Sequence, residues 1–347
     1  MPVDPIQLTR QLVDIESTTY HEGRAGAFLH EYLLSQRYNV ERMDVPQPER
    51  TITPGAGDGE RFNVYAAMPG VTPDIVLSTH FDTVPPYFGC TEDDEYLYGR
   101  GSCDAKGILA AQVAAADRLR EAGVKAGLLF VVGEERDSAG AQIANQNPRG
   151  SKYLINGEPT DNRLALASKG ALRVEIRAKG KMAHSAYPEL GDSAIDKLIE
   201  ALHDVLALEL PVEPDLGESG ASTLNIGLLE GGRAPNVIAD RAEAHILVRL
   251  VGPSEPVRQS ILKAVAGRAD VTFSLDLPFV RMRKVGNLPT MVAKFTTDIP
   301  SLTNWGEPFL LGPGSIHVAH TPDEKIAKKE LLEAVDLYYN LAASLVV

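Results

Sequence analysis

Residues 104–135, DAKGILAAQVAAADRLREAGVKAGLLFVVGEE, contain the pattern that decides the fold class. From Ala105 to Glu121 the apolar side chains recur at helical spacing, and Gly123 is a natural end for that helix. Residues 127–132 then form a continuous apolar run, which is typical of a strand buried on both faces of a sheet. A helix that leads into a buried strand indicates crossover connections, and therefore a mostly parallel sheet covered by helices.

The same alternation of helices and strands continues toward the N-terminus and past the quoted stretch. Helical spacing and short apolar runs predict two helices, at 5–15 and 23–36, and three strands, at 62–68, 74–79 and 152–155. The outer part of the chain is therefore predicted to be an α/β domain.

The pattern changes near Ser168, where half-buried strands and helices follow in a different order. We expect a strand at 171–178, a helix at 192–208, strands at 222–229 and 240–250, a helix at 254–267 and a strand at 271–277. The order βαββαβ is typical of a small ferredoxin-like domain. We therefore predict an insert at residues 168–277 within an outer domain made of residues 1–167 and 278–347.

Composition excludes several classes of partner. The 347 residues include 34 basic and 47 acidic side chains, a net charge of −13, which argues against binding to nucleic acid or to anionic lipid. No apolar run reaches the ~18 residues that a membrane helix needs. The two cysteines, Cys90 and Cys103, imply no disulfide framework, and the N-terminus has no signal-peptide pattern, so we expect a cytoplasmic protein.

Charged side chains and histidines follow the predicted strands where these end. Each has an ordinary structural explanation when taken singly, such as a helix N-cap, the first turn of a helix or a surface turn. Because open parallel sheets place their sites beyond the carboxyl ends of the strands, we instead expect these side chains to converge. The set comprises His80, Asp82, Asp104, Glu134, Glu135, Glu158 and, near the C-terminus, His317 and His320.

Carboxylates that crowd together repel one another unless cations lie between them. Nitrogen and oxygen ligands of this kind suit zinc, with cobalt or manganese as substitutes. The set is too large for one catalytic zinc, and it suits two metal ions that share a bridging carboxylate. We therefore predict two Zn²⁺ ions as cofactors.

Five segments, in this order along the chain, resemble the metal-site motifs of the M20 family of metallopeptidases and amidohydrolases. They are STHFDTVP (78–85), GRGSCDAKG (99–107), GEE (133–135), NGEPT (156–160) and GPGSIHVAHTP (312–322). That family includes acetylornithine deacetylase, succinyl-diaminopimelate desuccinylase, aminoacylase and glutamate carboxypeptidase. The resemblance implies a zinc-peptidase-like catalytic domain, with the insert acting as a lid and a dimerisation element.

The resemblance also implies a role for each residue of the metal site. Asp104 would bridge the two metals, His80 and Glu158 would complete one, and Glu135 and His320 the other. Glu134 would be the general base, and Asp82 would orient His80. His317 and Cys103 are the alternatives that we rank below these ligands, because His317 falls at a variable position of the family and Cys103 is expected to be a small packed residue.

Further residues would meet the substrate. In the segment GKMAHSAYP, His184 matches the lid histidine that reaches the active site of a partner subunit in this family. Asn236 and Arg249 match lid positions that contact the substrate carboxylate, which Lys169 would also help to hold. Ser315 stands beside the substrate where the family often has an aspartate, so it bears on specificity.

The activity expected from the resemblance is deacetylation of an N-acyl amino acid such as N-acetylornithine, in arginine or lysine biosynthesis, by a homodimer. A carboxypeptidase or dipeptidase, or a succinyl-diaminopimelate desuccinylase, with the same dizinc site is the alternative. Glu158, instead of an aspartate, resembles the acylase and carboxypeptidase branches of the family. A non-catalytic binding protein is a more remote alternative, and a nicotinamide dehydrogenase is disfavoured because GRGSCDAKG lacks the GxGxxG spacing.

Overall fold

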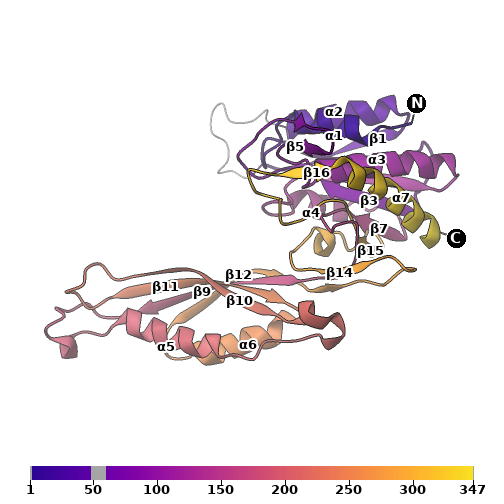
Figure 1. The fold of residues 1–347 in the computed structure, drawn as a ribbon. Helices are drawn as coiled ribbons and strands as arrows, with labels where there is room; N and C mark the ends of the chain where they lie inside the picture. The colour runs from indigo at the N-terminus through magenta and orange to yellow at the C-terminus, as the bar shows by residue number, and fades with distance from the viewer. Residues whose placement is uncertain (1, 48–59, 347) are drawn as a thin grey trace. The chain divides into compact units, whose positions relative to one another are not determined.

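The computed structural model describes residues 2–47 and 60–346 and divides into two compact units (Figure 1). The first unit comprises residues 1–166, 282–291 and 297–347, and the second comprises residues 167–281 and 292–296. The second unit is longer than the predicted insert, because it also takes in residue 167 and residues 278–281 and 292–296.

A six-stranded sheet forms the centre of the first unit. Its order is β1 (Asn39–Asp44), β2 (Phe62–Ala67), β6 (Ala126–Val131), β3 (Ile75–His80), β7 (Tyr153–Asn156) and β15 (Glu307–Leu310). The four strands from β6 to β15 are parallel, which confirms the mostly parallel sheet. The predicted strand near residue 62 is β2, and it pairs antiparallel with both β1 and β6. Mixed sheets commonly carry antiparallel strands at one edge of a parallel core.

Apolar side chains cover both faces of this sheet. On one face α1 (Pro5–Val13), α2 (Gly23–Ser35), α3 (Lys106–Glu121) and α7 (Lys328–Leu345) share a core with Phe62, Leu77 and Phe130. On the other face α4 (Ala139–Asn145) packs in a smaller cluster around the fully buried Trp305, whose indole N–H donates to the carbonyl of Ala144 at 3.0 Å. Every residue of β2, β3 and β6 is buried, as a sheet sandwiched between helices requires.

The second unit has the predicted order βαββαβ. Its antiparallel sheet runs β10 (Thr223–Gly231), β11 (Arg241–Leu250), β9 (Gly170–Lys179) and β12 (Asp270–Leu277). The helices α5 (Ala194–Leu206) and α6 (Ser254–Val265) lie on one face of the sheet, so residues of β11 alternate between buried and more exposed positions (Figure 1). The chain passes between the units within β8 (Leu164–Ser168), after β13 (Val280–Arg281), within β14 (Thr290–Ala293), and again after residue 296.

A small three-stranded sheet in the first unit joins β16 (Lys325–Ala327), β5 (Tyr96–Tyr98) and β4 (Thr91–Glu92). It links the C-terminal motif to the segment that precedes Asp104. Among the residues that the structure describes, no helix combines the length and apolar character that crossing a membrane would demand.

Candidate metal centre

Parallel pairing brings the ends of three strands together at one edge of the first unit's sheet. β3 lies between β6 and β7, and its last residue, His80, is in register with Val131. Beyond β7, the backbone N–H of Gly157 donates to the carbonyl of Ser78 at 2.7 Å. The residues that follow these strands, Glu134, Glu135 and Glu158, therefore start from the same edge as His80.

Asp104 and two histidines form the centre of the cluster. Oδ1 of Asp104 lies 3.0 Å from Nε2 of His80, and Oδ2 lies 3.4 Å from Nε2 of His320. The same nitrogen of His320 is 3.0 Å from Oε1 of Glu135. Ligand atoms of His80, Asp104 and Glu135 all lie within 4.8 Å of one another. One carboxylate that faces two imidazoles through its two oxygens is the arrangement that a bridging ligand needs.

Glu158 shows that the donor set fits a cation. Its side chain is 4% exposed, and Oε1 is buried with no hydrogen-bond partner among the described residues. Burial, and then the neighbouring Glu134 carboxyl, raise the pKa of Glu158 well above its ordinary value. A buried carboxylate oxygen without a donor is costly, and a bound cation removes that cost. The residues present therefore fit a site for divalent metal with nitrogen and oxygen ligands.

The carboxylate of Asp82 accepts hydrogen bonds from the backbone of the cluster. Its Oδ1 accepts the N–H of Glu134 at 3.1 Å, and its Oδ2 accepts the N–H of Glu135 at 3.3 Å and the hydroxyl of Thr19 at 2.8 Å. Burial raises the pKa of Asp82, but contacts with His80 and these donors outweigh it and hold the pKa below its usual range. The Nδ1 atom of His80 lies 3.0 Å from the backbone carbonyl of Asp82 and 3.5 Å from its carboxylate. The shorter of the two contacts that orient the His80 ring is therefore the one with the backbone carbonyl of Asp82.

Glu134 is half-buried and follows Gly133, whose φ of +81° turns the chain sharply after the strand. Burial raises the pKa of Glu134 well above its ordinary value despite the opposing effect of His80, and the carboxylates of Asp298, Glu135 and Asp104 raise it further. A carboxyl group of raised pKa can take up a proton near neutral pH and release it later.

Sequence reasoning missed Asp298, because it precedes a short 3₁₀ helix (Ile299–Ser301) and belongs to none of the five motifs. It is 1% exposed, and burial raises its pKa to about 6. It also missed the buried ion pair between Arg100 and Glu324. Arg100 lies in the motif GRGSCDAKG, and Glu324 lies two residues after the motif GPGSIHVAHTP. Their charge could be noticed in the sequence, but their pairing could not.

Three other predicted residues of the first unit lie near the loops of the cluster. Ser315 pairs with Thr160 in an isolated bridge, and its carbonyl accepts the thiol of Cys103 at 3.5 Å. Cys103 is buried, which raises the pKa of its thiol. Among the described residues, the group of ligand atoms that all lie within 4.8 Å of one another contains His80, Asp104 and Glu135. It contains neither the predicted ligands Glu158 and His320 nor the alternatives Cys103 and His317.

The remaining predicted residues belong to the second unit. His184 and Asn236 are exposed, and Nδ1 of His184 accepts the N–H of Ala186 at 3.1 Å. Lys169 is 3% exposed and donates through Nζ to the carbonyl of Ala221. Its pKa is lowered by burial and by two nearby cations, Lys294 and Arg249. Sequence reasoning did not select Lys294.

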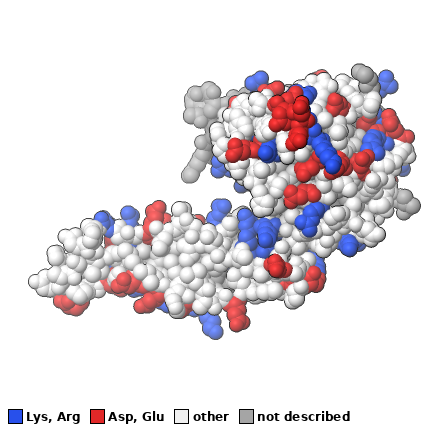
Figure 2. All heavy atoms as spheres, in the orientation of Figure 1, with Lys and Arg blue, Asp and Glu red and all other residues white. Residues whose placement is uncertain are grey.

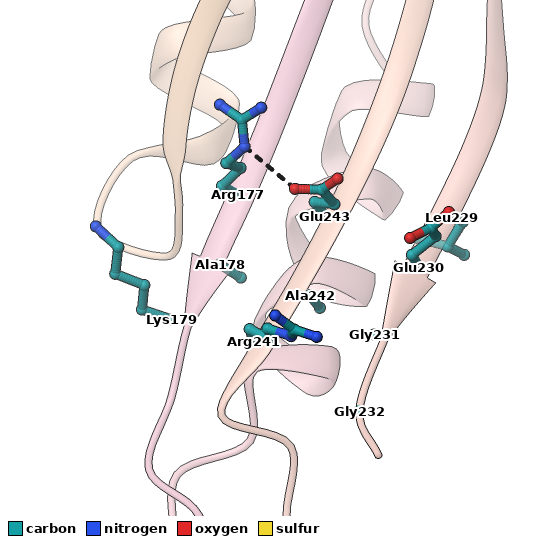
Figure 3. Close-up of a pocket in the computed structure, with 10 residues that line it drawn as sticks. All are labelled: Arg177, Ala178, Lys179, Leu229, Glu230, Gly231, Gly232, Arg241, Ala242 and Glu243. Carbon is teal, nitrogen blue, oxygen red and sulfur yellow. Dashed lines mark hydrogen bonds and ion pairs between the residues drawn. The ribbon is translucent and has the colours of Figure 1, made fainter.

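The second unit also has a cavity of about 720 Å³ at the ends of β9, β10 and β11 (Figure 3). Arg177 and Glu243 lie in it as an ion pair, and Lys179, Glu230 and Arg241 contribute further charges of both signs. None of the predicted site residues lines this cavity, and its charges largely offset one another. It therefore has no part in the candidate metal centre.

An α/β sheet with carboxylates and imidazoles at its carboxyl edge, joined to a βαββαβ unit, defines a class of metal-dependent hydrolase. Residues 76–344 match peptidase family M20/M25/M40. A probable carboxypeptidase of Aspergillus fumigatus is 38% identical over 383 residues, which cover 96% of this chain and 84% of that protein. The chain therefore belongs to the M20 peptidase family, whose members are metal-dependent and typically contain two zinc ions.

Solved structures share the fold. The aminopeptidase PepT of Bacillus cereus has a TM-score of 0.78 at 21% identity and covers 97% of both chains. The YXEP protein of Bacillus subtilis, described as a dinuclear metal-binding peptidase of the M20 family, has a TM-score of 0.68 at 17% identity, covering 98% of this chain and 97% of that one. The predicted fold class and the family resemblance are confirmed. Of the activities weighed above, the names of the relatives favour carboxypeptidase over acetylornithine deacetylase.

Proposed function

We propose that this protein is a metallo-carboxypeptidase that hydrolyses the amide bond before a residue with a free α-carboxylate. The observation that carries the proposal is the position of Asp104 between the imidazoles of His80 and His320, with Glu135 at 3.0 Å from His320. The 38% identity to a probable carboxypeptidase over 96% of the chain supports the choice of substrate class.

Each residue of the candidate metal centre has a role in the proposed hydrolysis. Asp104, His80, Glu158, Glu135 and His320 would hold two divalent ions, which would activate water and polarise the scissile carbonyl. Glu134 is a neighbour of the ligand Glu135 but is left free for proton transfer. It would accept the proton of the attacking water and donate it to the leaving amine, a transfer that its raised pKa favours. Asp82 keeps the backbone of both glutamates in place.

Recognition of the free carboxylate is proposed to involve the basic cluster formed by Lys169, Arg249 and Lys294 in the second unit. Lys294 and Arg249 lie close enough to Lys169 to lower its pKa, and Nζ of Lys169 donates to the carbonyl of Ala221. Among the described residues, no carboxylate of the protein forms an ion pair with any of these three cations. Cations without a carboxylate partner suit an anionic ligand, and a guanidinium can bind a carboxylate in two-point fashion. Asn236 and Ser315 remain proposed substrate contacts on the resemblance alone.

The experiment that tests the activity is a matched substrate panel. It compares an N-blocked dipeptide with a free C-terminus, the same dipeptide as its C-terminal amide, a free dipeptide, N-acetylornithine and N-succinyl-diaminopimelate. We expect hydrolysis of the free-carboxylate peptides and none of the C-terminal amide. Turnover of N-acetylornithine alone would replace the proposal by the deacetylase prediction, and turnover of none would contradict both.

A metal analysis tests the cofactor proposal. Protein dialysed against a chelator should lose activity, and about two equivalents of Zn²⁺, or of Co²⁺ or Mn²⁺, should restore it. Binding of fewer than one ion per chain at saturation would contradict the dinuclear centre and favour a non-catalytic binding protein.

We also propose a homodimer formed through the second unit. Its edge strand β10 has exposed Leu228 and Leu229, α5 has exposed Ile199 and Leu206, and much of the visible surface of this unit is uncharged (Figure 2). An exposed apolar edge strand favours pairing with another chain. Sedimentation should give a dimer, and Leu229→Lys should shift it toward monomer. A monomeric unaltered protein at micromolar concentration would contradict the proposal.

His184 is proposed to polarise the substrate carbonyl in the active site of the partner subunit. A mixture of His184→Ala chains with Glu134→Ala chains should then regain activity, because hybrid dimers contain one intact site. Each variant alone should be inactive. Absence of recovery in a confirmed mixed dimer would contradict the role in the partner's site.

A further inference from the structure

We propose that Glu324 is a positioning residue that fixes the backbone of Asp104 and thereby sets the geometry of the metal centre. This inference rests on the metal centre proposed above. Glu324 is not among the candidate ligands. Its side chain is 1% exposed, and it lies four residues after His320 in the sequence.

One oxygen of Glu324 collects the N–H groups of the loop that ends at Asp104. Oε1 accepts from Gly101 at 2.9 Å, from Cys103 at 3.2 Å and from Asp104 itself at 3.1 Å. Hydrogen bonds from backbone N–H groups to an ionised carboxylate are stronger than those between neutral groups. Three such bonds from within four residues leave the loop little freedom to turn Asp104 away from His80.

The second oxygen of Glu324 pairs with a buried guanidinium. Oε2 lies 2.5 Å from Nη1 of Arg100, whose side chain is 2% exposed. The Nε atom of Arg100 donates to the carbonyl of Pro86, and its guanidinium lies 5.0 Å from the centre of the Phe88 ring. Replacing a buried ion pair by apolar groups is often neutral for stability, so stability alone does not account for this one.

The same contacts join the loop that carries Asp104 to the C-terminal segment that carries His320. Glu324 adjoins β16, which pairs with β5, and its carbonyl accepts the N–H of Gly99 at 3.1 Å. Glu324 and Asp104 are 220 residues apart in sequence. The carboxylate therefore ties the C-terminal segment that carries His320 to the loop that carries Asp104, and so holds these two ligands in a fixed relation.

A second buried ion pair in the first unit provides a contrast. Glu22 and Arg61 are both fully buried, with Oε1 of Glu22 3.1 Å from Nε of Arg61. Oε2 of Glu22 has no hydrogen-bond partner among the described residues. Both oxygens of Glu324 are used, and all of its backbone donors belong to the Asp104 loop, which is the distinction that a positioning role requires.

The test measures metal affinity in Glu324→Gln, with Leu119→Ala as the matched control for destabilisation. Leu119 is fully buried at the far end of α3 from Asp104. Zn²⁺ affinity is obtained by competition with a chelating dye, and Co²⁺ coordination by the visible absorption spectrum. We expect Glu324→Gln to bind metal ~10–100-fold more weakly, with an altered Co²⁺ spectrum. Leu119→Ala should lower the melting temperature and leave both readouts unchanged.

Two further variants keep the inference falsifiable. Arg100→Lys retains a cation beside Glu324 and leaves the three N–H contacts, so its metal affinity should stay within ~3-fold of the unaltered protein. Glu324→Asp replaces Glu324→Gln if the latter does not fold, and should also weaken binding because the shorter side chain withdraws the acceptor. Unchanged metal affinity and spectrum in a folded Glu324 variant would overturn the positioning role alone. Absence of metal binding by the unaltered protein would instead overturn the metal centre itself.

Discussion

The sheets of the two units bury their residues in different ways. Every residue of β3 and β6 in the first unit is buried, whereas residues of β11 in the second unit alternate between buried and more exposed positions. A strand covered on both faces can expose chemistry only at its ends, while a strand covered on one face presents every second side chain to the surface. The candidate metal ligands of the first unit therefore follow the ends of its strands, whereas charged side chains such as Arg177 and Glu243 lie within the strands of the second unit.

Buried ion pairs distinguish the first unit, which also has exposed pairs such as Arg118 with Asp336. In the first unit, Arg100 with Glu324 and Arg61 with Glu22 are almost completely buried. In the second unit, pairs such as Arg177 with Glu243 stay open to water, with side chains about two-fifths exposed. Burying a charged side chain costs desolvation free energy. We therefore expect a buried ion pair where its charges have a role that apolar side chains could not fill. The comparison predicts that neutralising a buried charge of the first unit has a large effect and that neutralising an exposed charge of the second unit has a small one.

Glu134→Gln should give the largest effect. The amide cannot accept the proton of the attacking water, so turnover should fall by roughly 10²–10⁴-fold while metal content is unchanged. The measurement is kcat on the preferred substrate of the panel, together with metal analysis.

The control for Glu134→Gln is Glu230→Gln, which changes an exposed carboxylate in the cavity of the second unit. Its kcat should match that of the unaltered protein. Equal kcat values for Glu134→Gln and the unaltered protein would show that another group transfers the proton.

Asp82→Asn should weaken metal binding or turnover by ~10–100-fold. The amide can accept only one of the two backbone N–H groups that hold Glu134 and Glu135, and it places an N–H donor against the other. Glu243→Gln, in the exposed pair of the second unit, should leave metal affinity unchanged. Comparable losses in both variants would break the contrast between buried and exposed carboxylates.

Leu128→Ala should reduce the free energy of unfolding by about 2–5 kcal/mol, because Leu128 is fully buried between the sheet and its helices. The same substitution at Leu262, which is 40% exposed on α6, should change it by less than about 1 kcal/mol. Urea denaturation of both variants measures the difference. A larger loss at Leu262 would mean that another surface covers α6.

Tyr38→Phe should give the smallest effect, a change in stability that is visible only at alkaline pH. Burial raises the pKa of Tyr38 to about 12 from an ordinary value near 10. Between pH 10 and 12 the folded protein keeps a proton that the unfolded chain has lost, so stability should fall with rising pH by up to about 1.4 kcal/mol per pH unit.

The variant Tyr38→Phe should have a shallower pH dependence of the urea midpoint in that range. Parallel slopes for Tyr38→Phe and the unaltered protein would show that Tyr38 does not titrate in this window.

Much of the fold followed from local pattern. The helix after Asp104 and the strand before Glu134 were predictable because helical spacing and a continuous apolar run leave a strong periodic signal. The antiparallel pairing of β2 was not, because its apolar run is the same whichever direction its neighbours take. The short strands β4, β5 and β16 carry too few residues for a periodic signal.

For the candidate site, sequence motifs supplied the ligand types, and the tertiary structure supplied the partners. Glu324 lies in the segment that follows His320, yet nothing local shows that its carboxylate meets the loop from Gly101 to Asp104. Asp298 lies in no motif and becomes notable only through its burial. Contacts across more than two hundred residues are set by packing, which a linear pattern does not encode.

The family resemblance, the order of the elements and the types of the candidate ligands could be inferred from the amino-acid sequence, because they depend on local spacing and residue type. The folded chain was needed to find that the Asp104 carboxylate faces two imidazoles and that the Glu324 carboxylate accepts the backbone N–H of Asp104. Such relations depend on which strand ends meet at the edge of the folded sheet.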